Sequence, residues 1–275
     1  MRLSSRLTAV AVLATLLPTA GLGQNVFRAA GTDIKNGVGD VVYVLMSPAR
    51  ADKKNWLEFG GIMAITLAST IVDDNVDAWI VKQDSAGAFD NFEWFREREN
   101  PDNVEWSDIG AARWMSKFAL ATWGVGLIVD SENLREAGMG CLSTWISIAG
   151  TREINYRIFS RRRGSHANGD QYVLSWGYGE WEDRSWIAGH FANPMGCTKL
   201  WTDRFDLGPL EPALYVTTYA IGVSRMLDRR HWLSDTIIAG ALGYVAGKLV
   251  AERQEKRRPR RRPPVLPGTA RPGGQ

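Results

Sequence analysis

The sequence has few residues of the kinds that bind metals or crosslink a chain. Its 275 residues include two cysteines and three histidines, and no Cys/His spacing is typical of a metal site. We therefore expect no metal and no other cofactor. Cys141 and Cys197 could form a disulfide if the protein is exported, but nothing local in the sequence shows whether they meet.

Long hydrophobic runs are also scarce. The mean hydropathy is −0.20, and most apolar runs fall well short of the roughly 20 residues that cross a bilayer as a helix. Trp232–Val250 alone approaches that length, and it contains Asp235 near its start. The 12 tryptophans suit a membrane interface, an apolar core or a lipid groove. We favour a soluble or peripheral membrane protein, and a membrane-embedded bundle is the alternative.

The body of the chain lacks an excess of positive charge. Residues 251–275 hold eight Lys/Arg and two Asp/Glu, so the basic pI comes from this tail, and residues 24–250 are slightly acidic. Nucleic acid is therefore not an expected partner. The composition of the tail, rich in Arg, Pro and Gly, predicts a disordered end. Docking on anionic lipid is the alternative.

The N-terminus has the layout of a secretory signal peptide. Arg2 and Arg6 precede the apolar run Leu7–Leu17, and small residues follow as far as Gly23. We predict that residues 1–23 are a signal peptide and that the protein lies in the periplasm or cell envelope. An uncleaved membrane anchor is the alternative, although the apolar run is short for a span.

The remaining apolar segments predict an all-α protein. Their length and their Ala, Leu, Ile and Gly content favour helices, and residues 56–250 are expected to form a bundle of five or six core helices with long loops. The segments are Phe59–Val72, Phe118–Val129, Met139–Gly150, Leu214–Leu227 and Trp232–Val250. The polar connections are Asp84–Asp108, Arg161–Asp183 and Pro194–Pro212, and residues 24–55 are expected to be irregular.

The clearest chemical pattern is at the start of the last apolar segment. His231 is followed four residues later by Asp235, a spacing that places both side chains on one face of a helix. A carboxylate in that position would fix the imidazole tautomer and make the opposite ring nitrogen more basic, as a nucleophilic histidine requires. Arg225, six residues upstream, can present a fork of donors to a phosphoryl group.

The whole string resembles a known signature. Ser224-Arg225, five residues, His231, three residues and Asp235, followed by an apolar helix, is similar to the third motif of the type 2 phosphatidic acid phosphatase and vanadium haloperoxidase superfamily. Members of this superfamily share a helical bundle in which three motifs converge at one end.

The second motif of that family is represented by Gly189-His190, 41 residues before His231. Ile187 and Ala188 stand where the family usually has proline and serine. Gly189 would let the backbone approach a phosphate closely.

The first motif is the most altered. Arg163 matches the family arginine, Gly164 replaces its proline, and Tyr156 falls at the position of its lysine. Arg157 lies beside that position and could supply the missing charge. Arg161 repeats a basic residue that often precedes the motif arginine in this family.

The resemblance implies a metal-independent phosphatase acting on a phosphomonoester or a lipid phosphate or pyrophosphate. His231 would attack phosphorus to form a phosphohistidine, Asp235 would orient it, and His190 would protonate the leaving group and then activate water. The phosphate-binding residues would be Arg225, Arg163, Gly189 and Arg157. One alternative is vanadium-dependent halide oxidation in the same pocket. Another is a non-enzymatic anion-binding or structural protein that has lost parts of motifs one and two.

Overall fold

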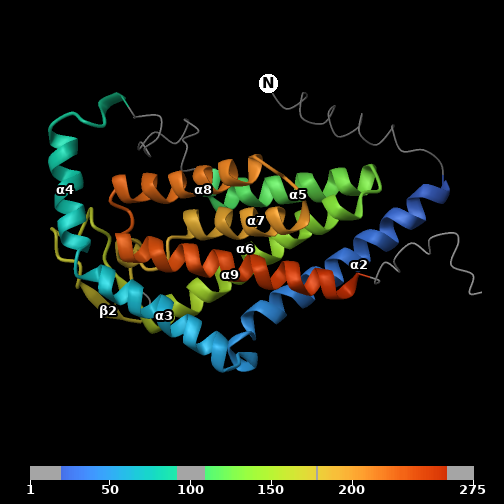
Figure 1. Ribbon diagram of the computed structural model, residues 1–275, viewed down its shortest axis with the longest axis horizontal. Coiled ribbons are helices and arrows are strands. Elements are labelled where there is room, and N and C mark those ends of the chain that lie inside the picture. Colours follow the sequence, from blue (N-terminus) through green and yellow to red (C-terminus); the bar gives the residue numbers. More distant parts are fainter. Residues whose placement is uncertain (1–19, 92–108, 178, 259–275) are drawn as a thin grey trace, which may run out of the picture.

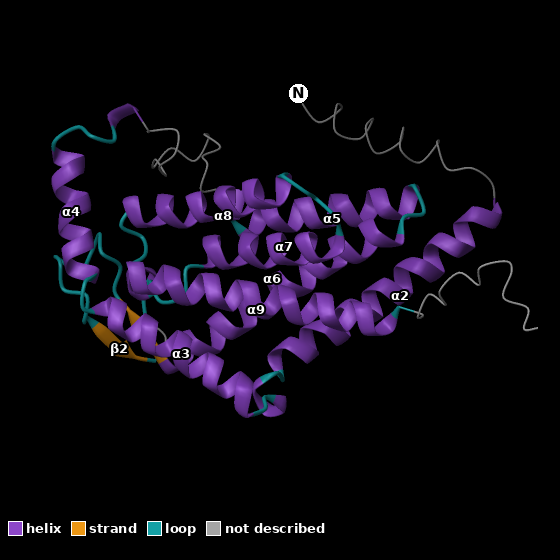
Figure 2. Cartoon of the chain, viewed as in Figure 1, coloured by secondary structure: helices purple, strands orange, loops and turns teal. Residues whose placement is uncertain are grey.

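The computed structural model describes residues 20–91, 109–177 and 179–258. Residues 1–19 of the predicted signal peptide and residues 259–275 of the predicted tail lie outside the described part. Residues 251–257 of that tail, predicted to be disordered, are helical instead, because Ala251 and Gln254 are buried against the bundle. Within the described part, the fold is a helical bundle with one small two-stranded sheet (Figure 2). The prediction of an all-α bundle is confirmed.

The bundle is built around three central helices, α6 (Glu132–Ile158), α7 (Gly189–Arg204) and α9 (Leu233–Arg257). The other described helices are α2 (Ala20–Leu45), α3 (Lys53–Thr70), α4 (Asp73–Ser85), α5 (Ala112–Ile128) and α8 (Leu210–Leu227). Strand β1 (Phe159–Arg161) pairs antiparallel with β2 (Leu174–Trp176). Two 3₁₀ turns, Pro48–Arg50 and Trp181–Asp183, complete the described elements.

Two of the predicted loop segments are wrong. Residues 24–55, expected to be irregular, lie largely in helix α2. Its glycines do not break the helix, because Gly37 packs against α6, where a Cβ would be 2.8 Å from the sulfur of Met139. Pro194, expected to open a polar connection, lies inside α7 and is buried. Tertiary packing around α7 outweighs the helix-breaking tendency of proline here.

Helix α9 approaches α7 closely through small residues. A Cβ on Gly243 would lie 2.2 Å from the carbonyl oxygen of Ala192, and one on Gly247 would lie 2.2 Å from that of Gly196. Any larger residue would force the two helices apart. The Ala/Gly-rich stretch of the last apolar segment is therefore the interface that holds α9 against the centre of the bundle.

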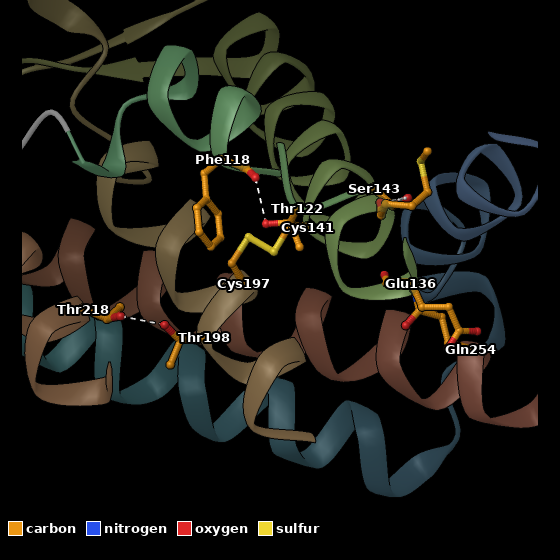
Figure 3. The surroundings of a disulfide bond; sticks show 10 residues. Phe118, Thr122, Glu136, Cys141, Ser143, Cys197, Thr198, Thr218 and Gln254 are labelled. Carbon is orange, nitrogen blue, oxygen red and sulfur yellow. Dashed lines mark hydrogen bonds between the residues drawn. A yellow bond between two sulfur atoms is a disulfide. The ribbon is translucent and has the colours of Figure 1, made fainter. Parts of the chain in front are cut away.

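A disulfide joins two of the central helices. Cys141 of α6 and Cys197 of α7 are both buried and bonded, with their Cα atoms 5.0 Å apart (Figure 3). That separation lies within the range of ordinary disulfides. Next to it, the hydroxyls of Thr198 and Thr218 form a 2.8 Å hydrogen bond between α7 and α8. The structure thus pairs Cys141 with Cys197, which the sequence left open.

Many large apolar side chains face outward from the bundle. Helix α3 exposes Trp56, Leu57 and Ile65, and α5 exposes Phe118 and Ile128. By length and composition, α9 is the one described helix that could cross a membrane, and half of its most apolar stretch is buried in the bundle. Helices α3 and α4, bent by 52° at their junction, would form a second span if taken together. Apolar surface of this extent is typical of contact with lipid or with another protein.

One end of the bundle collects the chemically important segments. In Figure 1 the C-terminal ends of α6 and α8 lie at the same end as the starts of α7 and α9. The start of α5 also packs there, since a Cβ on Gly110 would lie 1.9 Å from the carbonyl oxygen of His190. The connection between β2 and α7 runs across this end and contributes Ser185.

Candidate active site

His231 is buried and held by a backbone carbonyl. It lies two residues before α9, and its Nδ1 is 2.6 Å from the carbonyl oxygen of Ser185. A carbonyl oxygen can only accept, so Nδ1 carries the hydrogen and, in the neutral ring, Nε2 carries the lone pair. The geometry thus assigns the tautomer in which Nε2 carries the lone pair and Nδ1 the hydrogen.

The predicted partnership of His231 with Asp235 is wrong. The helix begins at Leu233, so His231 lies outside it and the i, i+4 spacing does not bring the two side chains together. One oxygen of Asp235 accepts from the backbone N–H of Trp232 at 3.0 Å and from the hydroxyl of Ser185. Asp235 therefore acts on His231 indirectly, by holding the residue whose carbonyl orients the ring.

The other oxygen of Asp235 belongs to a buried ionic network. Arg161 donates to Asp235 at 2.7 Å, to Asp73 at 2.8 Å and to the hydroxyl of Ser234 at 2.7 Å. Asp73 also accepts from the backbone N–H of Ser234 at 3.0 Å. Burial raises the pKa of Asp235, and Arg161 opposes that effect. Arg161 is thus a structural cation that ties β1 to the starts of α4 and α9.

His190 lies in the first turn of α7, the central helix. Ala188 is the N-cap and has no side chain able to bond the first N–H groups of the helix, which leaves an end with a preference for anions. The preceding residue, Ile187, has φ of 63°. A β-branched residue is strained in that left-handed conformation, and such strain is concentrated at functional sites.

Arg163 and Arg225 reach the same place from different elements. Arg163 follows β1, with its backbone N–H bonded to the carbonyl of Glu182 at 2.9 Å, and Arg225 lies in the last turn of α8. Both side chains are buried, and both lower the pKa of His231 and of His190. The structure therefore brings together two arginines and two histidines that the sequence motifs singled out.

Arg157, predicted to bind phosphate, is not part of this group. Its side chain is 70% exposed, and its Nη2 pairs with Glu153 one turn earlier at 2.9 Å. Arg152, on the opposite side of the last turns of α6, is directed to the site instead. Its Nε donates to the carbonyl of Ile187 at 3.0 Å, and its Nη2 donates to the hydroxyl of Tyr156 at 2.8 Å.

Two arginines were missed by sequence reasoning. Arg152 and Arg113 both lower the pKa of His190, together with Arg225 and Arg163. The motif spacing pointed to Tyr156 and Arg157. Arg157 lies on the exposed face of α6, whereas Arg152 lies on the face that meets α7. One feature of the sequence could have identified Arg152: it is the first charged residue after a long uncharged stretch of α6.

The electrostatics of the site keep both imidazoles neutral. Burial and then Arg225, Arg152, Arg163 and Arg113 lower the pKa of His190 from 6.5 to about 3. Burial, Arg225 and Arg163 likewise lower the pKa of His231 well below its ordinary value, and the Ser185 carbonyl partly opposes them. The carboxylate of Asp228 lies 3.6 Å from Nη1 of Arg225 and offsets part of this charge. The cluster of arginines as a whole is complementary to an anion.

These low pKa values predict that acid destabilises the protein. Below pH 6.5 the unfolded chain binds a proton at His190, and the folded protein does so only near pH 3. The free energy of unfolding should therefore fall between pH 6.5 and 5 by up to about 1.4 kcal/mol per pH unit from this group. Urea unfolding at several pH values measures the slope, and His190→Gln should reduce it. An unchanged slope in His190→Gln would contradict the assignment.

Among the described residues, no group of three or more His, Cys, Asp or Glu side chains is arranged to hold a metal ion. The site is instead a cluster of guanidinium and imidazole groups at a helix N-terminus. That donor set suits an anion with several oxygens. In comparisons with protein-family models, curated proteins and solved structures, nothing matches the chain.

Proposed function

We propose that this protein is a metal-independent phosphatase that hydrolyses a phosphate ester through a phosphohistidine on His231. The observation that carries the proposal is the state of His231: a neutral ring whose Nδ1–H is held by Ser185, beside the buried Arg225 and Arg163. The similarity of its motifs to those of the type 2 phosphatidic acid phosphatase superfamily supports the same function.

In the first step, Nε2 of His231 attacks phosphorus while Arg225 and Arg163 hold the non-bridging oxygens. Guanidinium groups fixed in a buried site stabilise the charge of the transition state without reorganising. The first N–H groups of α7, at Gly189, face the same anion. The bond from phosphorus to the leaving oxygen breaks as the P–N bond forms.

In the second step, water attacks the phosphohistidine and releases inorganic phosphate. His190 is neutral in the empty site, and the negative charge of a bound phosphoryl group raises its pKa. It is therefore suited to take the proton of the attacking water. Asp235 acts as a positioning residue, because its bond to Ser185 holds the carbonyl that orients His231.

Vanadate provides the test of this function. It can adopt the trigonal bipyramidal shape of the transferring phosphoryl group, so we expect it to inhibit hydrolysis and to bind at least about 10-fold more tightly than phosphate. Chelators should have no effect. The measurement is hydrolysis of a generic aryl phosphate by the purified protein with vanadate, EDTA or neither.

Three outcomes would contradict the proposal. Activity that disappears with EDTA and returns with a divalent ion would indicate a different site. Oxidation of bromide by the vanadate-loaded protein and peroxide would indicate a haloperoxidase. Neither hydrolysis nor vanadate binding would indicate an anion-binding or structural protein.

We also propose that the protein works in the periplasm or cell envelope, in contact with a membrane surface. The buried Cys141–Cys197 disulfide supports an oxidising compartment. The outward apolar side chains of α3 and α5 support the contact with lipid. Failure of the protein to float with lipid vesicles in a density gradient would contradict the membrane contact.

A further inference from the structure

Helix α4 lies at the end of the bundle that carries the site. In Figure 1 it stands apart from the central helices at that end. Three of its residues are buried, Asp73, Asp77 and Ile80. The two carboxylates are one helical turn apart, so the same face of α4 presents both. Asp73 belongs to the network of Arg161, and Asp77 makes a second connection to the site.

Asp77 and Arg229 form an ion pair with two parallel hydrogen bonds. Nε of Arg229 donates to Oδ1 of Asp77 at 2.7 Å, and Nη2 donates to Oδ2 at 2.8 Å. The side chain of Asp77 is 7% exposed and that of Arg229 is 29% exposed. Two bonds between planar groups fix their orientation as well as their distance. The pair therefore holds the guanidinium of Arg229 in one place against α4.

Arg229 in turn joins two segments of the site. Its Nη2 also donates to the carbonyl of Gly164 at 2.7 Å, and its own carbonyl accepts from the backbone N–H of Ser165 at 3.0 Å. Gly164 and Ser165 directly follow Arg163 in the chain, whereas Arg229 lies shortly before His231. One residue thus connects the loop that carries a phosphate-binding arginine to the turn that carries the nucleophile.

The backbone and the packing at this junction are specific to these contacts. Arg229 has φ of 54°, a left-handed conformation that costs a non-glycine residue roughly 1 kcal/mol or more and persists where the surrounding contacts enforce it. Gly164 stands where the first motif of the resembled family has proline, and a Cβ there would be 2.8 Å from Oδ1 of Asp77. The carboxylate of Asp77 therefore fills space that a larger residue at position 164 would need.

We propose that Asp77 and Arg229 are positioning residues, whose ion pair holds Arg163 in place relative to His231. The inference rests on the proposed phosphatase function and adds to that site two residues that act through others. Without the ion pair, the guanidinium of Arg229 no longer fixes the loop that follows β1. Donors held in place stabilise a transition state better than mobile ones, so kcat should depend on the pair more than substrate binding does.

The variant Asp77→Asn keeps the shape of the side chain and removes its charge. We expect it to lower kcat for an aryl phosphate about 10- to 100-fold, with a change in KM of less than about threefold. Its affinity for vanadate should fall about 10-fold or more, and that for inorganic phosphate less, because vanadate resembles the transition state. Steady-state kinetics and calorimetry with the two anions measure these effects.

Two further variants separate positioning from general stability. Arg229→Lys should keep more activity than Arg229→Gln, because lysine retains the charge without the fork of donors. Asp74→Asn removes a neighbouring carboxylate of α4 that accepts from the backbone N–H of Asn75, and its kcat should equal that of the wild type. A wild-type kcat in folded Asp77→Asn, or an equal loss in Asp74→Asn, would overturn the proposal.

The space shared by Asp77 and position 164 provides a double-mutant test. Gly164→Ala should lower kcat about 10-fold or more in the wild-type background, because its Cβ displaces the carboxylate. In the background of Asp77→Ala it should add less than about a threefold loss. Independent, additive losses would show that the two residues do not act through the same contact, which would overturn the proposal.

Amide hydrogen exchange gives a readout that does not require turnover. Asp77→Asn should speed exchange about 10-fold or more in residues 163–166 and 229–231, and Asp74→Asn should leave it unchanged. Faster exchange with an unchanged kcat would assign the pair a structural role alone and overturn the positioning role. If the wild type neither hydrolyses phosphate esters nor binds vanadate, the phosphatase function fails. Exchange then still decides whether the pair joins the two segments, and unchanged exchange in Asp77→Asn would overturn that.

Discussion

Replacing His231 with alanine is expected to lower kcat for phosphate ester hydrolysis by about 10⁴-fold or more, because no other described group is positioned to form the covalent intermediate. The ring is held by one bond to Ser185 and is otherwise enclosed. Its removal leaves a cavity and an unpaired carbonyl, so it should cost about 2–3 kcal/mol of stability. Steady-state kinetics and thermal unfolding of the same preparation measure the two effects.

The exposed His166 supplies a matched control. Its Nδ1 contacts the hydroxyl of Ser165, and it plays no part in the proposed mechanism. His166→Ala should retain the activity of the wild type. Added imidazole should recover part of the activity of His231→Ala by entering the vacated space as the nucleophile. Full activity in His231→Ala would rule out the mechanism.

The second large effect concerns stability. Arg161→Met should lower the free energy of unfolding by about 3–5 kcal/mol, because it leaves the buried carboxylates of Asp73 and Asp235 without their cation. Methionine has a similar length, so loss of packing contributes little. Urea unfolding at pH 7 measures the change.

The neighbouring Arg162 provides the comparison. It pairs with Asp183 at 2.8 Å, but its side chain is 42% exposed. An exposed ion pair contributes about 0–1 kcal/mol, so Arg162→Met should have a small effect. If both variants lose a similar free energy of unfolding, the buried ion pairs of Arg161 contribute no more to stability than an exposed ion pair. The kcat of Arg161→Met should also fall, since Asp235, which bonds Ser185, then loses the cation that fixes its carboxylate.

Much of the fold followed from the pattern of apolar residues. The five apolar segments correspond to α3, α5, α6, α8 and α9, although the helices extend beyond most of them. Helices α2, α4 and α7 were missed because glycine, acidic residues or proline interrupt them. Those residues lower local helix propensity. Burial against neighbouring helices outweighs the low helix propensity of these residues. Such burial depends on long-range packing, so a short window of sequence does not show it.

The motif residues were predicted less evenly. Arg225 and Arg163 both act electrostatically on His231 and His190, so the structure places these four residues near one another. The family resemblance, and not the spacing alone, implied that they would meet. The side chain of Arg157 is exposed to solvent. Arg152, and not Arg157, contacts the segment that leads into α7. About half a helical turn, or roughly two residues, separates the inner from the outer face of α6, so a small error in motif alignment selects the wrong face.

Residue types and their order along the chain were therefore enough to predict a helical bundle, which is confirmed. They could not predict which atom orients His231, because that depends on where α9 begins and on a carbonyl 46 residues away. The pairing of Cys141 with Cys197 and the approach of Arg152 to Gly189 are long-range contacts of the same kind. Local periodicity carries the preference for a helix, but the packing of α6, α7 and α9 sets the distances between their side chains.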